Sequence, residues 1–185
     1  PPVFIVVCNN TSTSKLVYDY IGGFEHQDGD RTILHNGRLA LFRNYDEHGN
    51  RLARPRTLLI DSEQLESGDA LDANFRDMAG DEIERFRREL RERGDMAAAE
   101  NITDQDLLRE VMNTVGKVGR LGEPVRCVVS VAMLTEGWDC NTVTHILGVR
   151  AFGTQLLCEQ VVGRALRRQS YDLNDDGLFD VEYAD

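Results

Sequence analysis

The chain lacks any apolar run that approaches the roughly 18 residues a membrane-spanning helix requires. The first ten residues, "PPVFIVVCNN", enter an apolar run without a preceding basic segment, so we do not expect this stretch to be a signal peptide. Its four cysteines include no Cys-x-x-Cys pair, which argues against a structural zinc module. We therefore expect a cytoplasmic protein with reduced thiols, no metal ligands of its own and no membrane partner.

An excess of positive charge is absent too. The 185 residues carry 21 Lys and Arg against 32 Asp and Glu, for a formal net charge of -11. This balance excludes a protein that coats nucleic acid through its net charge, although it allows a narrow basic track. The 41% hydrophobic and 29% charged residues are typical of a soluble globular domain. We interpret the abrupt beginning and end as those of a piece of a longer protein.

Strand and helix patterns alternate along the chain. β-branched, apolar runs predict buried strands at 3–8, 57–61, 125–134 and 142–149. Helical spacing of apolar residues, with candidate caps and terminal glycines, predicts helices at about 15–21, 81–93 and 103–115. This alternation predicts an α/β fold with a mainly parallel sheet covered on both faces, and 125–134 as its centre.

One section interrupts the pattern. Residues 25–56 are polar and contain a single modest apolar run, "RLALF". We interpret this section as an insertion in one domain of residues 1–185, folded as a hairpin that turns at His48-Gly49-Asn50.

The loop after the longest predicted strand is the first candidate site. It reads "TEGWDCN", and ligands of parallel α/β sheets gather where such strands end. Thr135 can donate to a phosphate, Gly137 permits a tight turn, and Asp139 can accept from ribose hydroxyls. The alternative is a plain turn with solvated acids. Trp138 is either a platform for a base or an apolar plug beneath this loop, and a lone aromatic favours the plug.

The stretch "CEQVVGRALRRQ" is the second candidate site. Gln160, Arg164 and Arg167 lie at i, i+4 and i+7, so a helix places them on one stripe. One amide and two forked cations suit phosphate oxygens. Gly163 allows a phosphate or a neighbouring backbone to approach closely. The alternative is an ordinary solvated arginine face.

Together these two stretches match a family in order and spacing. "SVAMLTEGWDCNTVTHI" followed by "QVVGRALRR" resembles motifs V and VI of superfamily 2 helicases, most closely the Res subunit of type III restriction enzymes. "VFIVVCNNTSTSK" and "TLLIDSEQ…EIERFRREL" stand where that family has motif IV and its next strand and helix, so that only 25–56 lacks a counterpart.

The resemblance implies a three-layer, RecA-like second domain of an ATP-dependent DNA helicase or translocase. ATP and Mg²⁺ would be held mainly by a preceding RecA-like domain, and this domain would supply Arg164 and Arg167 as arginine fingers. The resemblance also implies two groups of binding residues. The residues expected at the nucleotide are Gln160, Gly163, Gly137 and Asp139. Those expected at DNA are Asn9, Thr11, Ser12 and Thr135. A modification methyltransferase is a further expected partner.

The phosphate-binding motif G-x-x-x-x-G-K-[ST] and a D-E-x-H box are both missing. The chain alone is therefore expected to be inactive, and glycine-rich 116–122 is interpreted as a connecting turn. Two other functions stay open: a RecA-like scaffold that binds nucleotide or nucleic acid without catalysis, and a motor that acts on RNA.

Two further features resemble sites. Residues 172–177, "DLNDDG", match the first half of a calcium-binding loop, but Tyr183 stands where a bidentate Glu belongs, so we predict a polar turn. His145 alternates with apolar residues in a predicted strand, and we interpret it as a packed histidine of the core.

Overall fold

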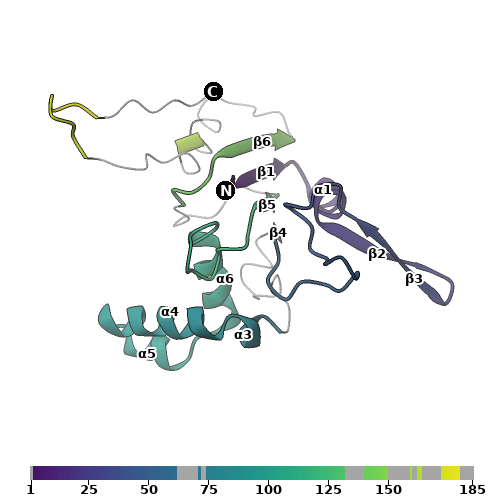
Figure 1. Ribbon diagram of the computed structural model, residues 1–185, viewed down its shortest axis with the longest axis horizontal. Helices are drawn as coiled ribbons and strands as arrows, with labels where there is room; N and C mark the ends of the chain where they lie inside the picture. Colours follow the sequence, from purple (N-terminus) through teal and green to yellow (C-terminus); the bar gives the residue numbers. More distant parts are fainter. Residues whose placement is uncertain are drawn as a thin grey trace.

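A computed structural model describes residues 2–61, 71, 74–131, 140–149, 159, 162–163 and 172–179. In these residues four strands form one parallel sheet in the order β4-β5-β1-β6 (Figure 1). The strands are β1 (Phe4–Cys8), β4 (Thr57–Ile60), β5 (Cys127–Ser130) and β6 (His145–Val149). The predicted parallel α/β sheet is confirmed, and each of the four strands is shorter than its predicted run.

Strand β5 lies inside the sheet, as its apolar sequence predicts. Cys127 pairs with Phe4 of β1 on one side and with Thr57 of β4 on the other. All four residues of β5 are buried, because both faces of the sheet are covered at this position.

Helix α1 (Thr11–Gly22) covers one face of the sheet. It begins at Asn10, whose side chain accepts a hydrogen bond from the amide of Thr13, and it ends where Gly23 takes a φ of 94°. Its apolar stripe packs against alternate residues of the sheet, and the residues of this contact are Val17, Tyr18, Ile21, Phe4, Val6, Cys8, Phe42, Leu59, Cys127 and Val129.

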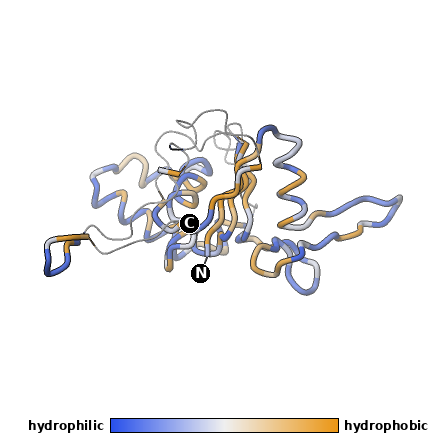
Figure 2. The backbone as a smooth tube through the Cα atoms, turned by 90° about the horizontal axis from the view of Figure 1, so that it is seen from above, coloured by the Kyte–Doolittle hydropathy of each residue, from blue (hydrophilic) through white to orange (hydrophobic). Residues whose placement is uncertain are grey.

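Helices α3 (Phe75–Met78), α4 (Gly80–Glu92) and α6 (Asp104–Asn113) cover the other face, and α5 (Met96–Glu100) packs against α4. Their main core side chains are Phe75, Ile83, Phe86, Leu107, Leu108 and Val111, packed on Ile5, Leu58, Ile60 and Val128. The sheet therefore lies between two helical layers (Figure 2). None of the helices among the described residues is both long and apolar enough to cross a membrane.

The hairpin of the polar section lies earlier than predicted. Strands β2 (Gly23–Asp28) and β3 (Arg31–Asn36) pair antiparallel and project from the body as a ribbon (Figure 1). Most of their residues are exposed, so no burial imposes an apolar alternation that the sequence would display.

The predicted turn at His48-Gly49-Asn50 is a side-chain-capped loop and not the end of a two-stranded ribbon. Asp46 accepts from the amides of His48 and Asn50, at 2.8 Å each. Only one isolated bridge, Tyr45 with Arg51, joins the two sides of this loop. Backbone hydrogen bonds also cross the loop, from Asp46 N to Asn50 O at 2.9 Å and from Leu52 N to Asn44 O at 2.8 Å, so the predicted turn is present without extended strands.

Candidate functional site

The carboxyl ends of the four parallel strands share one edge of the sheet, and the predicted site residues follow these ends in the chain. Asn9 follows β1 directly. The "TEGWDCN" loop begins five residues after β5 ends at Ser130, and the Gln160 stretch comes after β6. Helix α1 and the loop that precedes it carry the best described part of this edge.

Two asparagines shape the start of α1. Asn10 Oδ1 accepts from Thr13 N at 2.8 Å, and Asn10 Nδ2 donates to Asn9 Oδ1 at 3.1 Å. Asn9 is exposed, so this pair stands at the surface of the carboxyl edge. The sequence predicts Asn9 as a contact residue, and the structure adds that Asn10 is committed to capping the helix.

Thr11 and Ser12 form the exposed first turn of α1. Within the described chain their hydroxyl groups have no hydrogen-bond partner, whereas Ser14, two residues on, is buried and donates to Thr11 O at 2.9 Å. The first turn contains no acidic side chain. Free hydroxyls beside the positive end of a helix dipole form a surface that accepts anionic oxygens.

Most of the other predicted site residues fall outside the part of the chain that the structure describes. These are Thr135, Gly137, Asp139, Gln160, Arg164 and Arg167, together with Trp138. Gly163 is described: it is exposed in a helical stretch, and a Cβ added there would meet no atom within 4 Å. Among the described residues, none therefore fills the space beside Gly163.

The cysteines that the structure describes are free thiols, and two of them, Cys8 and Cys127, belong to the core beneath α1. Cys8, Cys127 and Cys140 are all buried. Burial raises the pKa of the Cys8 thiol and, with a smaller contribution from Cys8, raises the pKa of Cys127 to about 12. Both thiols stay protonated at neutral pH, so neither serves as a nucleophile.

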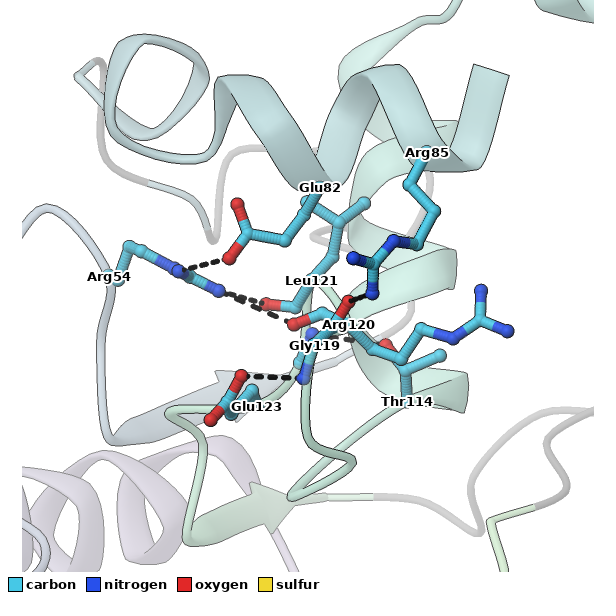
Figure 3. A network of polar contacts seen from close by, with 9 residues as sticks. Arg54, Glu82, Arg85, Thr114, Gly119, Arg120, Leu121 and Glu123 are labelled. Atoms are coloured by element: carbon cyan, nitrogen blue, oxygen red, sulfur yellow. Dashed lines mark hydrogen bonds and ion pairs between the residues drawn. The ribbon is translucent and has the colours of Figure 1, made fainter. Parts of the chain in front are cut away.

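The glycine-rich stretch 116–122 is a connecting turn, as predicted, and arginines hold it against α4 (Figure 3). Arg54 Nη1 donates to Glu82 Oε1 at 2.7 Å, while its Nη2 reaches the carbonyls of Arg120 and Leu121 at 3.4 and 3.3 Å. Arg85 Nη1 donates to Gly119 O at 2.6 Å. These contacts give the turn a structural role.

The loop at 172–177 is a polar turn, as predicted. Asn174 Oδ1 accepts from the amides of Asp176 and Leu178 at 3.1 and 3.0 Å, and Leu173 pairs with Phe179 across it. Among the described residues, no group of three His, Cys, Asp or Glu side chains is placed to hold a metal ion.

His145 is packed and has a polar partner, as predicted, but the expectation that it lies in the core is wrong. It begins the outermost described strand and is exposed, although its ring stacks on Phe4 at a centroid distance of 4.3 Å. Thr144 Oγ1 lies 2.7 Å from its Nδ1. The alternation predicted the strand correctly, but a strand at the end of the described sheet leaves one side of the ring open.

Two arginines that no sequence motif singles out lie at the opposite, amino edge of the sheet. Arg56 directly precedes β4 and Arg126 directly precedes β5, and Arg126 N donates to Arg56 O at 2.7 Å. An arginine immediately before each of two apolar runs was the available signal. Only the pairing of β4 with β5 reveals that the two residues are neighbours.

Comparisons of the chain with protein-family models, with curated proteins and with solved structures found no match. The functional interpretation therefore depends on the geometry and chemistry described above.

Proposed function

We propose that this chain is the second RecA-like domain of an ATP-dependent DNA helicase or translocase, similar to the Res subunit of type III restriction enzymes. The observation that carries the proposal is the parallel sheet whose carboxyl edge is extended by the exposed Asn9, Thr11 and Ser12. The two stretches with helicase-like motifs come after β5 and β6, in the chain order that such a domain requires.

In this proposal the two candidate clusters act on different ligands. Arg164 and Arg167 stabilise the charge that develops on the γ-phosphate of ATP, while the preceding domain holds the nucleotide and Mg²⁺. Gln160 shapes the nucleotide site, and Gly163 leaves room beside it. Gly137 and Asp139 couple that site to DNA. Asn9 with the first turn of α1 contacts the DNA backbone, joined by Thr135.

The protein would work in the cytoplasm, with DNA and with a modification methyltransferase as partners. The open first turn of α1 supports a nucleic-acid ligand, because exposed hydroxyls at the sheet edge suit phosphate oxygens, and it fits both the motor and a scaffold that binds nucleotide or nucleic acid without catalysis. Stimulation of hydrolysis by DNA or by RNA decides which nucleic acid it acts on.

The test is the rate of DNA-stimulated ATP hydrolysis by the protein that carries this chain together with its P-loop domain. Arg164→Ala and Arg167→Ala should each lower turnover by about 10³- to 10⁵-fold, because a finger acts on the transition state. Arg88→Ala is the matched control, since Arg88 is exposed on α4, away from this edge. Rates unchanged in both finger variants would favour the scaffold.

A further inference from the structure

An open cleft of about 590 Å³ lies at the amino edge of the sheet. Its lining consists of three arginines, one glutamate and two apolar residues, which are Arg54, Arg56, Arg126, Glu123, Leu41 and Pro124. Three guanidinium groups around one cavity are unexpected in a chain with a net charge of -11. The cleft lies at the edge opposite the predicted ATP and DNA site, so a ligand bound in the cleft would be a different molecule from the ATP and DNA of the proposed function.

Arg56 and Arg126 are the two cations of this cleft without a carboxylate partner among the described residues. They stand side by side on neighbouring strands, an arrangement that like charges disfavour. Arg56 Nη1 donates to Ala40 O at 2.6 Å, and Arg126 Nη1 donates to the carbonyls of Glu123 and Val125. These contacts use only the Nη1 atom of each guanidinium group. The other two nitrogens of each group can still donate two hydrogen bonds to an oxyanion.

The remaining charged groups of the lining are held in place by other contacts. Arg54 forms an ion pair with Glu82 at 2.7 Å, and Glu123 Oε2 accepts from Gly119 N at 2.7 Å (Figure 3). Arg54 Nε is nevertheless buried with no hydrogen-bond partner in the described structure. The side chains of Arg54 and Glu123 are therefore held in place without a ligand, while the Nε–H group of Arg54 has no acceptor among the described residues.

We propose that this cleft binds a small phosphorylated molecule. Arg56 and Arg126 donate hydrogen bonds to the phosphate oxygens, because a planar guanidinium group can donate to two oxygens of one phosphate at once. The volume exceeds what a lone phosphate needs and suits a small organic ligand. Leu41, which is 39% exposed, and Pro124 provide the apolar wall for the rest of that ligand.

The experiment is a calorimetric titration of the 185-residue chain with inorganic pyrophosphate, with AMP and with a short single-stranded oligonucleotide. We expect pyrophosphate and AMP to bind, AMP more tightly because it also covers the apolar wall. Added salt should weaken both complexes. No ATP hydrolysis is involved, so failure of the proposed motor function leaves this test intact.

Variants locate the binding. Arg56→Gln should weaken pyrophosphate binding about tenfold, as loss of a charge-assisted pair predicts, and the double variant with Arg126→Gln should abolish it. Arg109→Gln, an exposed arginine of α6 outside the cleft lining, is the control and should bind as the original chain does. Arg56 is exposed, so its single variant tests the proposal even where Arg126→Gln fails to fold.

Two results would overturn the proposal. One is the absence of binding for both small phosphates, whether or not the oligonucleotide binds. The other is binding to Arg56→Gln that is as tight as to the original chain, while circular dichroism shows the same fold.

Discussion

At the scale of single residues, Asn44 joins three parts of the fold through one buried side chain. Its exposed fraction is 2%. Its Oδ1 accepts from the amides of Arg56 and Thr57 at 2.9 Å each, and its Nδ2 donates to Thr57 O at 2.8 Å and to Tyr18 Oη at 3.1 Å. The start of β4, the preceding loop and α1 are therefore held by all four hydrogen bonds that an amide side chain can form.

Replacing this amide should destabilise the domain strongly. Asn44→Ala leaves the buried amide and carbonyl of Thr57 without these partners, and we expect the free energy of unfolding to fall by about 3 kcal/mol. Asn44→Asp keeps the two acceptor contacts but places a buried carboxylate oxygen against Thr57 O, so it should also destabilise the domain. Urea denaturation measures both, with the exposed Asn36→Ala as control. A loss for Asn44→Ala no larger than that of the control would contradict the role assigned to Asn44.

At the scale of elements, the sequence predicts the strands and helices that are buried in a core. It does not predict the exposed ribbon of β2 and β3. The strands β1, β4, β5 and β6 and the helices α1, α4 and α6 carry apolar patterns because each packs into a core. The ribbon of β2 and β3 is exposed on most of its length, so the predicted hairpin was placed at the strongest turn signal, His48-Gly49-Asn50, instead.

Of the candidate site, the sequence could predict the place of residues along the chain but not their neighbours in space. Asn9, Thr11 and Ser12 follow a predicted buried strand, and the structure places them, exposed, after its carboxyl end, whereas their role at DNA stays a prediction. Spacing within one segment cannot show which strands are neighbours. For that reason the pair Arg56 and Arg126 emerged only from the strand order.

The start of α1 allows a functional test that separates contact from stability. The triple variant Asn9→Ala, Thr11→Ala, Ser12→Ala removes exposed polar groups, so thermal stability should hold while DNA affinity of the intact protein falls about tenfold or more. Asn10→Ala should do the reverse, costing about 1 kcal/mol of stability through the lost cap.

The control for DNA binding is Thr32→Ala on the projecting ribbon, which should leave affinity unchanged. Fluorescence anisotropy with a labelled duplex measures affinity, and thermal unfolding measures stability. Unchanged DNA affinity in the triple variant would remove α1 from the proposed interface.

At the scale of the whole molecule, the parallel sheet has two chemically different edges. The carboxyl edge carries exposed amide and hydroxyl groups on α1, and the chain continues from β5 and β6 toward the helicase-like motifs. The amino edge carries the arginine cleft. We propose that the first edge drives an ATP-dependent motor and that the second binds a small phosphorylated ligand.

The most direct measurement is a structure of the intact protein bound to duplex DNA and to ADP with aluminium fluoride, a mimic of the transferring phosphate. We predict a guanidinium nitrogen of Arg164 or Arg167 at about 3 Å from the fluoride ligands, with Asn9 and the first turn of α1 against the DNA backbone. Both guanidinium groups turned away from the nucleotide, or locked in ion pairs within the chain, would contradict the account.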